Sequence, residues 1–342
     1  MFTAISVLDA MVRLPWESHK FPKALILAMR KEMALLLVIC MSPLLAWADE
    51  SRPVAHGSDP HEGGWIALEG TNLIKIPVLN VNLGMNWSQP FDYLPVYAEN
   101  QPIRGTFWGP RNRAGSEVRI AISRFNTSDL LSAFQVIESE AKTKEKGSRA
   151  VLNSTGDARF SLRGLSSSGM YTVFIFDENS SAVLSMMPLL VTKGDLTLQM
   201  PANITAGDFA RLRVNKSLPD NESINQSSIF AAILISRKDY ENARLVLVSK
   251  GTDESLNSTL SIGTKSMQMR ELPSLSMELL MQMLYLLPRN STAGMQESKD
   301  SGADILLITD PEWEKGSYIL TCGVYSSGKG LWGMKQEAVE VI

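Results

Sequence analysis

Histidine is scarce in this sequence, which limits the nucleophilic chemistry that the chain could perform. Serine and cysteine hydrolases need a general base, most often histidine. The three histidines are His19, His56 and His61, and none lies in a predicted folded domain. His56, Asp59 and His61 could approach one metal ion, but the Gly- and Pro-containing segment around them offers no preorganised site. No zinc-protease, dithiol, Walker A or dinucleotide-binding motif occurs. We therefore predict no catalytic residue, no metal site and no cofactor.

Two carboxylate clusters are the remaining candidates for acid–base chemistry. Glycosidases use a pair of carboxylates that flank the scissile bond. The clusters here are Asp177-Glu178 and the segment 310–314, Asp-Pro-Glu-Trp-Glu. Adjacent residues of a strand point to opposite faces, so the first pair is predicted to form a hairpin turn. The second is predicted to be a solvated acidic loop, with Ca²⁺ binding or a carboxylate-based hydrolase site as the alternatives.

Tryptophans on turns would give a surface on which sugar rings can stack. Five follow the N-terminal region, at positions 65, 87, 108, 313 and 332. Trp313 and Trp332 lie in predicted turns, so they are the possible ligand-binding residues, and they suggest a pair of carbohydrate-binding modules as an alternative function. Packing in the core is the other fate of a tryptophan, because its side chain is usually largely buried.

Acceptor sequences for N-glycosylation are unusually frequent. Ten of the sixteen asparagines begin an Asn-x-Ser/Thr triplet, and none has proline in the middle. Serine and threonine make up about one residue in six, so chance would give about two or three such triplets. We predict N-glycosylation on surface loops and strand edges. The ten predicted sites are Asn86, Asn126, Asn153, Asn179, Asn203, Asn215, Asn221, Asn225, Asn257 and Asn290.

The N-terminal region predicts export from the cell. Met29 is followed by a short basic segment, an apolar run over 34–41 and an Ala-Trp-Ala sequence that ends at Ala48. These are the three parts of a cleaved signal peptide over 29–48. Residues 1–28 are then expected to be a misassigned N-terminal extension. The Pro- and Gly-containing segment 49–64 is predicted to be a flexible leader.

The remaining sequence predicts a mainly β protein built of two domains. Short alternating segments, among them 103–108, 118–123, 171–176, 210–214 and 318–324, are separated by regular turn signals. Many short strands of this kind favour β-sandwiches. We place the first sandwich at 65–192 and the second at 193–342. Each is predicted to contain one inserted helix, over about 129–144 in the first and over 274–287 in the second.

The two predicted domains repeat a local pattern. Ala158–Leu162 followed by Gly169-Met-Tyr171 matches Ala303–Leu307 followed by Gly316-Ser-Tyr318. Gly-x-Tyr ahead of a late strand is typical of the tyrosine corner of immunoglobulin-like (Ig-like) sandwiches, in which the phenol bonds back to the backbone. We therefore predict two tandem Ig-like β-sandwich domains. Cys322 lies in the apolar strand after the second motif and is predicted to be a buried thiol.

Several stretches resemble a family of uncharacterised extracellular proteins of methanogenic archaea. They are 169–191, the segment 230–243 that begins Phe-Ala-Ala-Ile-Leu-Ile-Ser, and the segment 308–318 with Asp-Pro-Glu-Trp-Glu. The resemblance covers most of the chain after the predicted signal. It implies a cell-surface location and no particular activity. Such proteins often end in a hydrophobic anchor, and no transmembrane anchor is predicted for the mature chain.

These observations together predict a non-catalytic extracellular protein. A formal net charge of −3 argues against a nucleic-acid partner, which would require a basic face. The expected role of the secreted, glycosylated chain is structural, adhesive or interactive. Cell-envelope proteins or glycans are the expected partners.

Overall fold

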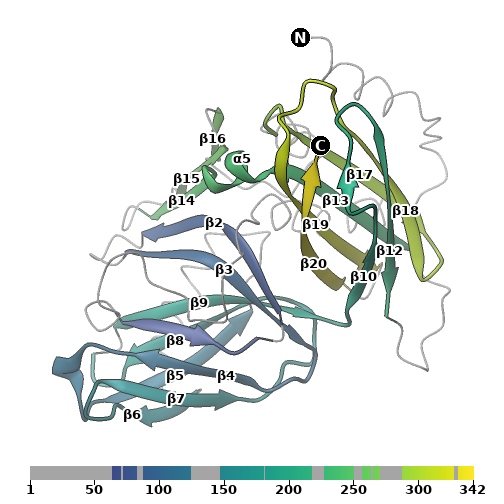
Figure 1. Cartoon of the computed structure of the whole chain (residues 1–342). Coiled ribbons are helices and arrows are strands. Elements are labelled where there is room, and N and C mark those ends of the chain that lie inside the picture. The colour runs from purple at the N-terminus through teal and green to yellow at the C-terminus, as the bar shows by residue number, and fades with distance from the viewer. Residues whose placement is uncertain are drawn as a thin grey trace.

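The described part of the protein is mainly β (Figure 1). The computed structural model describes residues 64–70, 72–82, 88–124, 147–180, 182–217, 227–249, 256–262, 265–269, 287–326 and 330–342. The predicted signal peptide with its cleavage site at Ala48, nearly all of the leader, and both predicted inserted helices lie outside these residues, apart from Leu287. Within the described ranges, no helix is both apolar enough and long enough to cross a membrane.

The strands fall into two halves that meet at residue 193. The first half holds β1 (Trp65–Leu68), β2 (Asn72–Asn82), β3 (Ser88–Ala98), β4 (Ile103–Trp108), β5 (Glu117–Arg124), β6 (Ser148–Val151), β7 (Asp157–Leu162), β8 (Gly169–Asp177) and β9 (Val183–Thr192), with a 3-10 turn η1 at Arg111–Arg113. The second half holds β10 (Leu196–Gln199), β11 (Asn203–Ile204), β12 (Phe209–Lys216), β13 (Ser228–Ser236), α5 (Arg237–Glu241), β14 (Arg244–Ser249), β15 (Leu256–Ile262), β16 (Lys265–Met269), β17 (Ser291–Ser298), β18 (Gly302–Ile308), β19 (Gly316–Ser326) and β20 (Gly330–Val341).

The two halves have the same strand topology. A three-stranded sheet has the order β1-β4-β7 in the first half and β10-β12-β18 in the second. Opposite it, β3-β9-β8-β5-β6 in the first half corresponds to β11-β20-β19-β13-β17 in the second. In each half, the edge strand named first in this order pairs in parallel with the strand that comes last along the chain. These pairs are β3 with β9 and β11 with β20. The internal repeat noticed in the sequence therefore extends to eight pairs of equivalent strands.

Each half buries one face of its three-stranded sheet against its larger sheet. In the first half, Phe107 and Phe160 of the small sheet share a core with Val173 and Leu189 of the large one. In the second half, a separate core joins Leu212 and Leu307 to Leu320, Val324 and other residues, and it includes the fully buried Cys322. The prediction that Cys322 is buried is confirmed. Alternate residues of the small sheets consequently face outward.

The halves are joined by an insertion from the second half. Strands β14, β15 and β16 do not stay with their own sandwich but extend the large sheet of the first half, because β14 pairs in parallel with β2. This differs from the separate domains expected from sequence. The phenol of Tyr240 in α5 donates to the carbonyl of Lys75 in the first half at 3.1 Å, and the amide of Gln336 donates to that phenol at 2.6 Å. Tyr240 is buried at this junction.

The tyrosine corners predicted from the Gly-x-Tyr motifs are confirmed. The phenol of Tyr171 donates to the carbonyl of Ser167 at 2.9 Å, and that of Tyr318 donates to the carbonyl of Glu314 at 2.8 Å. Both bonds run back four residues, and both phenols belong to buried side chains. Gly169 and Gly316, two residues before each tyrosine, adopt φ values of 145° and 140°, which side-chain-bearing residues rarely adopt.

Removing either corner hydroxyl should cost a similar amount of stability in the two halves. We expect Tyr171→Phe and Tyr318→Phe each to lower the free energy of unfolding by about 1 kcal/mol, the usual net value of one hydrogen bond. The double variant should lose the sum, because the sites lie in different halves. Urea unfolding measures these differences. A loss below about 0.3 kcal/mol in both single variants would contradict the corner role.

Strong alkali should destabilise the fold through Tyr318. Burial, with the nearby Glu314 carboxylate as a smaller cause, raises the pKa of Tyr318 from 10.0 to about 12. The unfolded chain loses the phenolic proton at lower pH than the folded chain, so this contribution is complete below pH 10 and is lost as the pH rises towards 12. Unfolding measured between these values should show a shallower decline in Tyr318→Phe than in the wild type. Equal slopes would contradict the assignment.

Candidate binding surface

Trp313 and Trp332 do not form an exposed platform, and the prediction that they could stack on a ligand is wrong in this respect. Their relative exposures are 5% and 2%. Trp313 follows the turn begun by Asp310, but its ring folds inward and stacks on the ring of Tyr318, with centroids 5.1 Å apart. Trp332 lies within β20 rather than in a turn, and the ammonium group of Lys216 lies 5.1 Å from its ring. Both rings therefore belong to the second half's core.

The carboxylate clusters serve the turns in which they lie. Asp177 ends β8, and its carboxylate accepts hydrogen bonds from the amides of Asn179 and Ser180 and pairs with Arg113. The Ser180 amide, followed by Arg113, holds the pKa of Asp177 below its usual range. The predicted hairpin turn is thus confirmed. Asp310 accepts a hydrogen bond from the amide of Glu312 at 2.8 Å. Among the described residues, no group of three potential metal-ligating side chains gathers.

The sequon asparagines that the structure describes are accessible. Asn153, Asn179 and Asn203 are exposed, while Asn215 and Asn290 are partly exposed. Asn257 lies in β15, of whose side chains nothing is described, and Asn86, Asn126, Asn221 and Asn225 lie outside the described residues. Each of the five described sequon asparagines is thus at least partly exposed.

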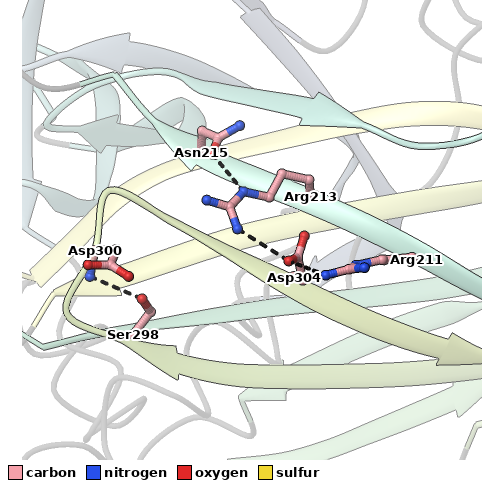
Figure 2. Close-up of polar contacts among 6 residues, drawn as sticks. All are labelled: Arg211, Arg213, Asn215, Ser298, Asp300 and Asp304. Carbon is pink, nitrogen blue, oxygen red and sulfur yellow. Dashed lines mark hydrogen bonds and ion pairs between the residues drawn. The ribbon is translucent and has the colours of Figure 1, made fainter.

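The outward side of β12 and β18 carries a compact set of charged side chains (Figure 2). We call this outward side the second-half face, and its residues are Phe209, Arg211, Arg213, Asn215, Asp304, Leu306 and Ile308. Asp304 accepts from Arg211 at 2.7 Å and from Arg213 at 3.3 Å, and Arg213 also donates to the Asn215 amide oxygen at 3.1 Å. Arg211, with Arg213 as a smaller cause, lowers the pKa of Asp304. A turn beside the face is closed by the Asp300 amide donating to Ser298.

The other end of the second-half face is apolar. Phe209, Leu306 and Ile308 are 68%, 53% and 42% exposed, although their strand neighbours Ala210 and Leu307 are buried. The strand register places Phe209 opposite Ile308 and Leu306 opposite Arg211. Exposed apolar groups next to arginines are common at protein interfaces. Sequence reasoning predicted both strands but did not use their alternation to find these outward residues.

Comparisons with known proteins do not assign the chain to a family. No protein-family profile and no curated protein matches it. Native Escherichia coli alpha-2-macroglobulin is 13% identical over 72% of this chain and 16% of its own, with a TM-score of 0.23. The Yersinia pseudotuberculosis adhesin InvE is 10% identical over 80% of this chain and 60% of its own, with a TM-score of 0.21.

A teleost fish polymeric Ig receptor ectodomain is 8% identical to the chain, covering 78% of it and 97% of the receptor chain, with a TM-score of 0.18. The chain spans less than two thirds of the macroglobulin and of the adhesin. Likenesses of this strength carry no argument about function.

The exposure of the second-half face can be tested with a matched pair of neighbouring leucines. Leu306→Ser should change the free energy of unfolding by no more than about 0.5 kcal/mol, because that side chain faces solvent. Leu307→Ser should cost at least about 2 kcal/mol, because it cuts a cavity in the core and buries a hydroxyl there. Urea unfolding of both variants gives the comparison. Equal losses would contradict the observed strand register.

Proposed function

We propose that this chain is an exported, N-glycosylated cell-surface protein that acts by binding or assembly rather than by catalysis. Its sequence resembles that of extracellular proteins of methanogenic archaea, and this resemblance supports the proposal. Its expected partners are proteins or glycans of the cell envelope. The scarcity of histidine and the structural use of Asp177 and Asp310 favour this role over a hydrolase.

We propose further that both halves are Ig-like sandwiches. Three observations support this. Each half packs a three-stranded sheet on a larger one, each pairs an early strand in parallel with its last strand, and each closes a tyrosine corner at the start of the penultimate strand. The corner is typical of the Ig-like architecture, which also serves many cell-surface proteins. On this proposal β14–β16 form an insertion between equivalent strands of the second sandwich.

The observation that carries the functional proposal is the number and placement of the sequons. Ten triplets far exceed the chance number, and the five asparagines with described side chains are all at least partly exposed. Asn153 also lies in a tight turn, where its amide oxygen accepts from the hydroxyl of Thr155, the third residue of its own sequon, at 2.7 Å. Glycans on such turns would protrude into solvent.

Cell fractionation combined with intact mass and N-terminal sequencing tests the proposal. We expect the native protein in the envelope or medium fraction, starting at Asp49, with a mass above that of its polypeptide. Asn153→Gln should remove the mass of one glycan. A matched control is Asn112→Gln, because Asn112 is exposed but begins no sequon, and its mass should change only by the substitution.

A cytosolic protein of unmodified mass would contradict both export and glycosylation. An exported but unmodified protein would leave the location standing and would remove glycosylation from the proposal.

A further inference from the structure

The outward side of β1, β4 and β7 carries two tryptophans that lie opposite each other on the adjacent strands β1 and β4. We call this side the first-half face, with Trp65, Arg104, Thr106, Trp108, Asp157, Arg159 and Ser161 as its residues. The register places Trp65 directly opposite Trp108. Both indoles are partly exposed, whereas their strand neighbours Ile66 and Phe107 are buried. Directly opposed residues of an antiparallel pair have Cβ atoms about 5 Å apart, so the two side chains leave the sheet next to each other.

Two arginines stand beside the tryptophans. Arg104 and Arg159 are exposed, and the register sets Arg159 opposite Thr106, diagonal to both Trp108 and Arg104. Such diagonal neighbours lie about 7–8 Å apart. Neither guanidinium forms an ion pair with any residue in the part of the chain that the structure describes. On the second-half face, by contrast, Asp304 neutralises part of the charge of Arg211 and Arg213.

The internal repeat shows that the fold does not require these residues. Equivalent register positions in the second half hold Thr197 and Asn215 in place of the two tryptophans, and Asp304 in place of Arg159. The same sheet therefore forms with small polar groups at those positions. The first-half face thus has two features that folding alone does not explain: partly exposed indoles, and guanidinium groups that form no ion pair with the described residues.

We propose that the first-half face binds an acidic saccharide, with Trp65 and Trp108 stacking on sugar rings and Arg104 and Arg159 binding carboxylate groups. Indole rings offer flat apolar area and a polar edge. Guanidinium groups match carboxylates in a bidentate geometry. The other outward side chains, Thr106, Ser161 and Asp157, can exchange hydrogen bonds with hydroxyl groups.

A saccharide fits this face better than a protein does. A protein interface usually has an apolar centre, and no strongly exposed large aliphatic side chain lies among the residues of this face, whereas Leu306 and Ile308 lie on the second-half face. In Figure 1, β4 and β7 lie on the side of the first half turned away from the second, so a long glycan could approach.

The saccharide proposal supplies a ligand class for the proposed binding role and rests on that role. Fractionation tests export and titration tests the ligand, so the two can fail separately.

Titration of the full chain with oligogalacturonide, followed by calorimetry and tryptophan fluorescence, tests the proposal. We expect binding that weakens with added salt, and weaker binding of a neutral malto-oligosaccharide. Trp108→Ala and Arg159→Ala should each lower the affinity for oligogalacturonide about tenfold or more. Trp108→Tyr keeps an aromatic ring and should retain most of the affinity, which separates loss of stacking from misfolding.

Arg149→Ala is the matched control, because Arg149 is an exposed arginine of the first half that lies in β6 of the larger sheet, outside the first-half face, and this variant should bind as the wild type does. Circular dichroism of each variant confirms folding. Failure of the wild type to bind oligogalacturonide, or unchanged affinity in folded Trp108→Ala and Arg159→Ala, would overturn the proposal. An envelope protein that is captured through Trp65 and Trp108, without oligogalacturonide binding, would equally overturn it in favour of a protein partner.

Discussion

The two-residue period of the small three-stranded sheets is the constraint on which the rest of this molecule depends. Each small sheet must bury one set of alternate side chains, such as Phe107 and Phe160 or Leu212 and Leu307, to complete a core. The pleat then forces the intervening residues outward. A slip of one residue in register would exchange the two sets and place Arg159 or Asp304 in apolar surroundings. The same constraint that stabilises each half therefore also fixes which side chains can meet a partner.

A second constraint sets how the halves are joined. The outer edge of β2 would present unpaired backbone groups, and β14 from the second half pairs with it in parallel. The buried phenol of Tyr240 adds a hydrogen bond to Lys75 at the same junction. In addition, Ile233 and Ile319, on the side of their sheet opposite to the second core, join the core of the first half. The halves are thus packed against each other. In Figure 1, β4 and β7 lie on the side of the first half turned away from the second, and β12 and β18 lie on the side of the second half turned away from the first.

Local patterns in the sequence predict the parts of this fold that local forces decide. Alternating segments such as 103–108 and the Gly-x-Tyr corners were predicted correctly because period and turn chemistry act over a few residues. β3 was missed because Pro90 and Pro95 argue against a strand. The short helix α5 was missed, although Ser236 accepts a hydrogen bond from the amide of Asp239 and so gives a capping signal. Two other features were not predicted because they depend on tertiary contacts. The Trp313 ring points inward, where it stacks on Tyr318. The pairing of β14 with β2 joins residues that are far apart in the chain.

The internal repeat gives the strongest argument about function, because it distinguishes the residue types that both halves use for folding from those that only one half carries. Equivalent strands in the two halves bury similar apolar residues on their inner sides, as Phe160 and Ile305 illustrate. Their outer sides differ in kind. One carries indoles and arginines that form no ion pair within the described ranges, and the other carries apolar groups with arginines that share an aspartate. Since one topology accommodates both sets, stability does not explain the difference. Two dissimilar outward faces on one packed unit would allow each face to meet a different partner, and this supports the binding role proposed above.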